Sequence, residues 1–357
     1  MGKEERDTEP MGTSPQASGP PGVDPVALRA HLDRALPGHV VGEIRVRRIE
    51  GGRSNLTYLL TDDIHRCVLR RPPLGQLPDT AHDMGREYRV LSALADSAVP
   101  VPTPVLLCPD PVVIGAPFYV MDHVDGTVYR SAEDLAPLGA RRSGAIVRDL
   151  LDHLARIHAL DPAAVGLADF GRPAGFLARQ PRRWKTQLAT ATGSRALPEA
   201  EQLHSRLAAQ VPAGAPACLI HGDYRLDNVL IDADDRVAAV LDWELATVGD
   251  PLTDVALFLV YYASLNGAMP TDVDVLAAPH PDLPTGASLL ARYQHHRPLD
   301  LDRLDWYLAL AFFKLAVLTE HLQAQHHSAM TVSLLRAGLT ALARDPGPTN
   351  IPPGEVV

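Results

Sequence analysis

One short polar segment constrains the fold and function of this chain more than any other, because it interrupts a series of apolar runs. Residues 217–220 are apolar, and residues 221–228 read His-Gly-Asp-Tyr-Arg-Leu-Asp-Asn. Two β-like runs follow at residues 229–231 and 237–241, and an Asp-Asp turn separates them. Asp242 comes directly after the second run. The pattern therefore predicts a small β-hairpin with acidic and amide side chains at one edge.

Three oxygen-bearing side chains meet at that edge, and their chemistry suits phosphoryl transfer. That reaction needs a carboxylate to hold and deprotonate the attacking hydroxyl, and oxygen ligands for Mg²⁺ on the phosphates. We predict Asp223 as the catalytic base and Asn228 and Asp242 as the metal ligands.

The His-Gly-Asp-x-x-x-x-Asn pattern and the later Asp resemble the catalytic and metal-binding loops of aminoglycoside phosphotransferases and their protein-kinase relatives. Gly222 stands where protein kinases carry Arg. The resemblance gives Arg225 the place of the kinase lysine that neutralises the transferring phosphate. It gives His221 a structural role in supporting the loop.

The order of elements agrees with this resemblance, because a strand-rich part precedes a helix-rich part. We predict an α+β, bilobal protein-kinase-like fold with a small β-rich N-lobe and a larger helical C-lobe. The N-lobe is expected over residues 24–121 and the C-lobe over 122–344, with disordered tails at 1–23 and 345–357. Expected C-lobe helices cover residues 143–160, 198–209, 251–265, 287–295, 301–325 and 330–343.

The first two predicted strands, residues 44–49 and 56–61, enclose a glycine-rich turn. This turn resembles the phosphate-covering loop of the family, in which backbone N–H groups can approach oxygen anions because glycine lacks a Cβ. The residues assigned to nucleotide binding here are Gly51, Gly52, Ser54 and Asn55.

The third predicted strand, residues 66–71, occupies the place of the kinase strand that carries the phosphate-binding lysine. The resemblance makes Arg70 the cation on the α- and β-phosphates, with Arg71 as the second choice. Glu87, on a helix expected from near Asp79, is the predicted ion-pair partner. Met121 ends a strand that resembles the segment joining the lobes, where the backbone would hold adenine.

Three features bring the chain closest to the subgroup that is also found fused to acyl-CoA dehydrogenases. They are the Gly-Arg-Ser-Asn-Leu-Thr-Tyr run at 52–58, the Leu-Arg-Arg-Pro-Pro run at 69–73, and Arg183-Trp184-x-x-Gln187. The resemblance implies a hydroxyacyl-CoA or a hydroxy acid as the phosphate acceptor. Trp184 and Gln187 are candidates for the acceptor pocket, and Asp250 for bracing the catalytic loop.

Composition limits the classes of molecule that this chain is expected to bind. With a net charge of −10 and no dense Lys/Arg block, the chain is not expected to bind nucleic acid. No apolar segment is long enough to cross a membrane, and the three cysteines are widely separated. We therefore expect a cytoplasmic monomer or homodimer that uses ATP and Mg²⁺ on a small-molecule hydroxyl substrate.

Two alternatives remain open. An antibiotic kinase would need an acidic pocket for polyamine substrates, which Asp272, Asp274 and Asp282 could form. A nucleotide-binding pseudokinase would normally lack the base or a metal ligand, whereas all three are present. A metallophosphoesterase is disfavoured because its further ligand blocks are missing.

Overall fold

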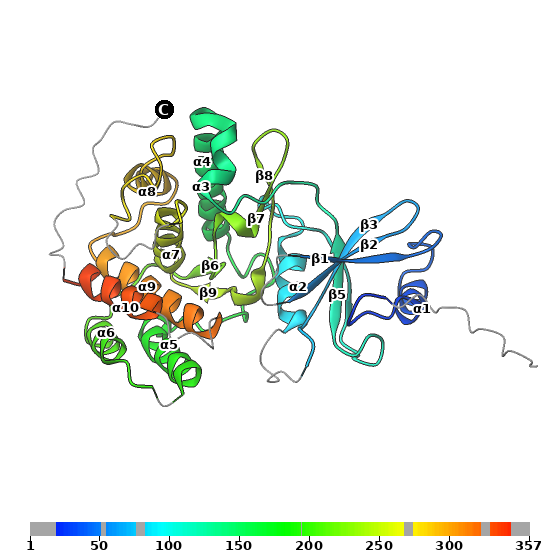
Figure 1. The fold of residues 1–357 in the computed structure, drawn as a ribbon, viewed down its shortest axis with the longest axis horizontal. Coiled ribbons are helices and arrows are strands. Elements are labelled where there is room, and N and C mark those ends of the chain that lie inside the picture. Colours follow the sequence, from blue (N-terminus) through cyan, green and yellow to red (C-terminus); the bar gives the residue numbers. More distant parts are fainter. Residues whose placement is uncertain are drawn as a thin grey trace, which may run out of the picture. The chain divides into compact units, whose positions relative to one another are not determined.

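The computed structural model of this 357-residue chain describes residues 19–50, 55–75, 83–193, 195–267, 274–322 and 329–343. Both predicted disordered tails fall almost wholly outside these ranges, so they stay predictions. The chain divides into two compact units (Figure 1). The first comprises residues up to Gly85 together with Val105–His123, and the second comprises Arg86–Pro104 and the chain from Val124 onward.

The first unit is built on a five-stranded sheet in the order β1-β2-β3-β5-β4. The strands are β1 (Arg45–Ile49), β2 (Leu56–Thr61), β3 (Arg66–Arg71), β4 (Pro104–Cys108) and β5 (Phe118–Asp122). Tyr58 on β2 pairs with Leu69 on β3, which pairs with Val120 on β5. These side chains are buried together with Leu28 and Leu32 of helix α1 (Pro25–Ala35), so the helix completes the core.

Sequence patterns located the five strands but missed α1. Its start carries a recognisable signal, because the Asp24 carboxylate accepts hydrogen bonds from the backbone N–H groups of Val26 and Ala27. Pro25 occupies the first helical turn, where a missing N–H costs nothing.

The second unit is mainly helical, with two short strand pairs (Figure 1). Its helices are α2 (Met84–Leu94, whose first two residues belong to the first unit), α3 (Ala132–Leu135), α4 (Gly139–Ala159), α5 (Phe176–Thr192), α6 (Pro198–Ala209), α7 (Leu252–Ala263), α8 (Gly286–His296), α9 (Leu304–Leu322) and α10 (Ala329–Ala341). The strand pairs are β6 (Cys218–Ile220) with β9 (Thr247–Gly249), and β7 (Val229–Ile231) with β8 (Val237–Val240). The six helices expected in this part all form, whereas α5 and the β6–β9 pairing were not foreseen.

Helix α7 is the buried centre of the second unit. It is apolar on every side, as a helix enclosed by other elements must be, and Ala256 and Val260 have no exposed surface. Helix α9 packs against α7, α5 and α10. Among the described helices, none combines the length and apolar character needed to cross a membrane.

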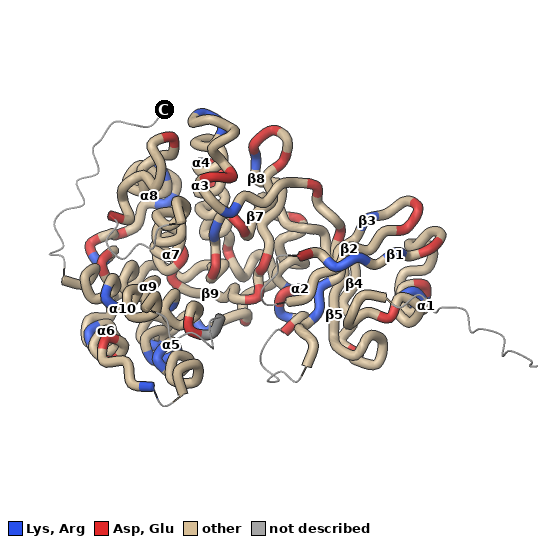
Figure 2. The backbone as a smooth tube through the Cα atoms, in the orientation of Figure 1, with Lys and Arg blue, Asp and Glu red and all other residues tan. Residues whose placement is uncertain are grey.

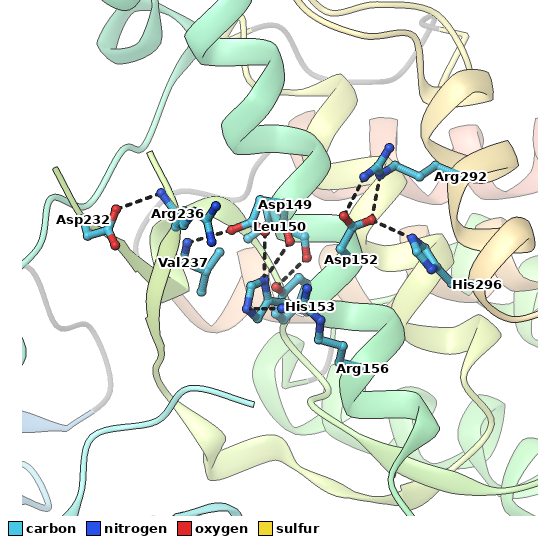
Figure 3. Close-up of polar contacts among 11 residues, drawn as sticks. Asp149, Leu150, Asp152, His153, Arg156, Asp232, Arg236, Val237, Arg292 and His296 are labelled. Atoms are coloured by element: carbon cyan, nitrogen blue, oxygen red, sulfur yellow. Dashed lines mark hydrogen bonds and ion pairs between the residues drawn. The ribbon is translucent and has the colours of Figure 1, made fainter. Parts of the chain in front are cut away.

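Helix α4 is fastened on two sides by aspartates one turn apart (Figure 3). The Asp149 carboxylate accepts a 2.8 Å hydrogen bond from the backbone N–H of Val237 on β8. The Asp152 carboxylate binds the Arg292 guanidinium of α8 through two hydrogen bonds of 2.6 and 2.7 Å, and the His296 ring nitrogen lies 3.0 Å from it. Helix α4 thereby joins the β7–β8 hairpin to α8.

Candidate active site

The loop after β6 begins with a glycine that no other residue could replace without strain. Gly222 has φ of +83°, and a Cβ at this position would lie 2.5 Å from the carbonyl oxygen of Leu245. Both the backbone conformation and the close approach exclude a side chain. The arginine of protein kinases therefore could not occupy this position in this chain.

The loop is held from below by Asp254 of α7. One carboxylate oxygen of Asp254 accepts a 2.6 Å hydrogen bond from the backbone N–H of His221, and the other accepts a 2.9 Å bond from that of Gly222. The bracing role predicted for Asp250 was therefore assigned to the wrong aspartate. Both aspartates lie at the start of the same helix, and sequence order alone could not distinguish them.

Asp250 instead fixes the start of α7 to other segments. Its carboxylate accepts hydrogen bonds from the backbone N–H groups of Leu252 at 2.9 Å and Ala215 at 2.7 Å, and from the Tyr307 hydroxyl at 2.9 Å. The first of these bonds satisfies a backbone N–H at the start of the helix. Burial raises the pKa of this carboxyl.

A buried histidine completes the brace. His158 of α4 lies with one ring nitrogen 3.3 Å from the Asp254 carboxylate and the other 2.7 Å from the Tyr293 hydroxyl. Burial lowers the pKa of His158. The neutral ring satisfies both contacts when it donates to Asp254 and accepts from Tyr293.

Asp223, the predicted base, has two side-chain partners. Its Oδ1 accepts a 2.7 Å hydrogen bond from the Tyr261 hydroxyl, and its Oδ2 lies 3.2 Å from the Asn228 amide nitrogen. Tyr261 was missed by the sequence analysis, because a tyrosine in an apolar helix looks like an ordinary core residue. Burial, followed by the nearby charge of Asp223, raises the Tyr261 pKa well above its usual value, so the hydroxyl stays a donor.

Asn228 is oriented by its amide nitrogen, which also donates to the Asp223 backbone carbonyl at 2.8 Å. Within the described ranges its amide oxygen accepts no hydrogen bond and remains available to a ligand. Asp242 is brought alongside because the backbone N–H of Leu241 donates to the Asn228 carbonyl at 2.8 Å. The structure therefore brings together Asp223, Asn228 and the start of the segment with Asp242.

Asp242 has a backbone conformation that is unusual for a residue other than glycine. Its φ of 65° and ψ of 61° lie in the left-handed region, which Asp tolerates better than most side chains. The next residue, Trp243, is fully buried, and its N–H donates to the Glu87 carboxylate of α2 at 3.2 Å. Unusual backbone geometry of this kind is frequent at functional sites.

The donor set fits a hard divalent cation. One carboxylate and one amide oxygen suit Mg²⁺, which usually takes the rest of its ligands from water and substrate phosphates. Within the described ranges there is no cluster of three or more His, Cys, Asp or Glu that could hold a metal ion.

Arg225 lies beside the predicted base. Its guanidinium forms an ion pair with Asp227 and is centred 4.7 Å from the Tyr261 ring centroid. His221 makes only supporting contacts with the loop: its ring nitrogens lie 2.8 Å from the Leu241 carbonyl and 3.2 Å from the backbone nitrogen of Asp223. These contacts agree with the structural role expected for His221.

The residues predicted to bind nucleotide are divided between the two units. Gly51, Gly52 and Ser54 lie outside the described residues. Asn55, Arg70 and Met121 are buried in the first unit, where Arg70 pairs in register with Thr57 and Tyr119. Glu87 belongs to the second unit, so its ion pair with Arg70 stays a prediction.

Arg71, the second of the two adjacent arginines of β3, is tied to its own unit. Its guanidinium donates to the backbone carbonyls of Gly22, Ile114 at 2.9 Å and Pro72 at 3.1 Å.

A pocket opens beside the catalytic loop within the second unit and encloses about 520 Å³, counted out to its mouth. Its walls come from α5, α7 and α9, and Gly222 forms part of its edge. Trp184 lines this pocket, as expected for an acceptor site, whereas Gln187 is not among the lining residues.

Residues 45–290 match the model of a family described as the phosphotransferase enzyme family. Mouse acyl-CoA dehydrogenase family member 10 is 35% identical over 302 residues, which is 82% of this chain but only 28% of that protein. A Ralstonia eutropha protein assigned to the aminoglycoside phosphotransferases has a TM-score of 0.73 at 29% identity, covering 89% of this chain and 98% of that one.

Choline kinase from Cryptosporidium parvum has the same fold, with a TM-score of 0.60 at 12% identity over 89% of this chain and 94% of that one. These similarities confirm the predicted kinase-like α+β fold and the predicted relation to chains fused to acyl-CoA dehydrogenases. This chain spans under a third of the length of the mouse relative.

Proposed function

The chain belongs to the phosphotransferase enzyme family, and from that premise we propose that it transfers the γ-phosphate of ATP to a hydroxyl group of a small molecule. The observation that carries the proposal is the arrangement around Asp223. Its carboxylate is oriented by Tyr261 and Asn228. Asp242 lies nearby because the preceding residue, Leu241, forms a backbone hydrogen bond with Asn228. A base and two oxygen ligands are thereby held within one small hairpin region.

Asp223 would accept the proton of the acceptor hydroxyl as the new bond to phosphorus forms. Tyr261 and Asn228 hold the carboxylate in place before the substrate arrives, which lowers the cost of reorganisation. Asn228 and Asp242 would hold Mg²⁺, which when bound neutralises charge on the phosphates. Arg225, beside the base, would stabilise negative charge on the transferring group.

In the first unit, Arg70 is the proposed cation on the α- and β-phosphates, with Gly51, Gly52, Ser54 and Asn55 as the covering turn. Glu87 is its proposed partner, and Met121 belongs to the strand proposed to hold adenine. Support for this assignment comes from the place of Arg70 on β3, the central strand of the sheet.

For the acceptor we propose a hydroxyacyl-CoA or a hydroxy acid. Support comes from the mouse relative, whose name refers to acyl-CoA dehydrogenases and to which this chain is 35% identical. The antibiotic-kinase alternative has in its favour the Ralstonia eutropha protein assigned to the aminoglycoside phosphotransferases, which is 29% identical, but the acidic pocket that it requires is not supported. Asp274 and Asp282 are exposed and do not line the pocket, and Asp272 lies outside the described residues.

The direct test measures transfer of labelled γ-phosphate from ATP with Mg²⁺ to hydroxyacyl-CoAs, hydroxy acids, aminoglycosides, macrolides and amino alcohols. Asp223→Asn should retain nucleotide binding and lose about 10²- to 10⁴-fold in turnover, the usual contribution of a general base. Asp234→Asn makes the same chemical change at an exposed hairpin turn and should leave turnover unaltered.

Unchanged turnover in Asp223→Asn would contradict the assignment of the base. If no acceptor is labelled while nucleotide still binds with Mg²⁺, the result would favour a nucleotide-binding pseudokinase over a kinase.

A further inference from the structure

The pocket beside the catalytic loop is lined by two cations from different helices. Arg183 comes from α5 and Lys314 from α9, and both side chains contact the ring of Trp184. The Arg183 guanidinium carbon is 5.1 Å and the Lys314 Nζ is 5.4 Å from the ring system. One buried aromatic side chain therefore holds two positive charges in the same wall.

Neither cation forms an ion pair with a carboxylate in the part of the chain that the structure describes. Lys314 donates to the carbonyl oxygen of Gly222, which leaves further ammonium hydrogens for a ligand. Burial is the largest influence on the Lys314 pKa and lowers it below its usual value. The charges of Asp223 and Asp254 act in the opposite direction, and that of Arg183 acts in the same direction as burial. Two cations this close repel each other unless an anion lies between them.

The single carboxylate among the lining residues is already engaged. Asp254 accepts hydrogen bonds from the backbone N–H groups of His221 and Gly222 and contacts His158. Its oxygens are directed at the catalytic loop that it braces. It is therefore not available to bind a cationic ligand in the pocket.

Helix α5 strengthens the positive character of this wall. It carries Arg179, Arg182, Arg183 and Lys185 and no acidic residue, although the whole chain has a net charge of −10. Of these, Arg183 lines the pocket and Lys185 forms an ion pair with Glu201 of α6. Lys and Arg gather on this helix in Figure 2. A local excess of one sign in an oppositely charged protein raises the local concentration of ligands of the other sign.

We propose that Arg183 and Lys314 form an anion-binding subsite in the acceptor pocket, and that the acceptor carries a carboxylate or phosphate group besides its hydroxyl. The inference rests on the proposed kinase function and names its class of substrate. Gly222 borders the pocket and immediately precedes Asp223, so an acceptor anchored by its anion would present its hydroxyl near the base. Neutral and polycationic alcohols would lack this anchor.

The test uses hydroxybutyrate, hydroxyhexanoate and hydroxyoctanoate, each as free acid, as methyl ester and as coenzyme A thioester, with kanamycin as a polycation. Binding is measured by calorimetry without nucleotide, and KM and kcat are measured by phosphate transfer. The variant is Arg183→Gln, and the matched control is Arg182→Gln, an exposed neighbour on α5 that does not line the pocket.

Arg183→Gln should weaken binding of the anionic probes, and raise their KM, by about tenfold or more, since a charge-assisted hydrogen bond contributes at least this much. It should leave the esters unchanged, and Arg182→Gln should change neither class. An effect on the free acids identifies the carboxylate as the bound anion. An effect on the thioesters alone identifies the phosphates of the carrier.

Lys314→Met should weaken the same probes and also lower kcat, because Lys314 contacts Gly222. If Arg183→Gln affects acids, thioesters and esters alike, or affects none of them, the subsite is wrong. Tighter binding of kanamycin than of the acids would also overturn it. Binding of acids that depends on Arg183 without any transfer would support the subsite while contradicting the proposed kinase function.

Discussion

The predicted catalytic loop and the proposed acceptor pocket are neighbours in the second unit, yet they are assembled in different ways. The loop places its predicted base and metal ligands within residues 221–242, and hydrogen bonds join consecutive parts of that segment. The pocket takes its walls from α5, α7 and α9, which are far apart in the sequence. A local segment can be identified from its pattern, whereas a site made from distant helices cannot.

The comparison also separates chemistry from selectivity. Hydrogen bonds within the loop and from α7 position the loop residues without a ligand. Arg183 and Lys314 carry charge without a carboxylate partner among the described residues. We therefore expect substitutions in the loop to reduce turnover for every acceptor. Substitutions in the pocket should instead change which acceptors are preferred.

The largest effect is expected from Asp242→Ala, which removes the only carboxylate proposed as a metal ligand. Mg²⁺-dependent nucleotide binding should weaken by about 100-fold or more, as measured by titration with and without Mg²⁺. Since Asp242 has a positive φ, Asp242→Asn provides a second variant that tolerates this conformation. Tight Mg²⁺-dependent binding in both variants would contradict the proposed role.

A smaller effect, on stability, is expected from Gly222→Ala. The added methyl group would meet the Leu245 carbonyl at 2.5 Å in a left-handed conformation, which should cost about 2–3 kcal/mol of unfolding free energy. Gly115→Ala is the matched control, because Gly115 has the same φ of +83° with nothing within 4 Å. Equal losses in denaturant titrations of the two variants would show that the contact with Leu245 is unimportant.

Tyr261→Phe tests whether α7 also positions the Asp223 carboxylate, in addition to bracing the backbone of the loop. Loss of the 2.7 Å hydrogen bond to Asp223 should lower kcat by about tenfold, with little change in the KM for ATP. Tyr262→Phe removes the next hydroxyl on the helix, which donates to the Pro284 carbonyl, and should leave kcat unchanged. A similar kcat in wild type and Tyr261→Phe would exclude a positioning role.

The smallest effect concerns pH. Because burial lowers the pKa of His158 below its value in the unfolded chain, the unfolded state binds the proton first as the pH falls. Unfolding free energy should therefore decrease below about pH 6.5, with a slope of about 1 kcal/mol per pH unit for this group. His158→Gln should flatten the slope in denaturant titrations. Burial of His153 acts in the same direction, so part of the slope should persist.

The sequence was most informative where function and local structure coincide. The strands of the first unit and the hairpin around residues 229–240 follow from alternating apolar residues and turn-forming aspartates. Asp223, Asn228 and the segment with Asp242 could be placed together because they flank that hairpin. Their catalytic roles and the nucleotide contacts of Arg70, Glu87 and Met121 remain predictions.

What the sequence could not supply depends on contacts between distant segments. Tyr261 and Asp254 lie on one helix, and their polar groups reach the catalytic loop only because α7 is buried beneath it. The family resemblance gave the bracing role to Asp250, and sequence order alone could not distinguish it from Asp254 at the start of the same helix. Helix α5 was missed, since it contains Pro181 and an internal proline usually ends or bends a helix.

Helix α7 holds both the brace and the hydroxyl that reaches the predicted base, whereas much of the pocket wall belongs to α5 and α9. During evolution, substitutions at Arg183, Phe176 or Leu310 could therefore alter which alcohols are accepted without moving Asp223. The same freedom does not extend to Asp254 or Tyr261. Descendants of one ancestral enzyme could in this way acquire different acceptors while they inherit one unaltered reaction centre.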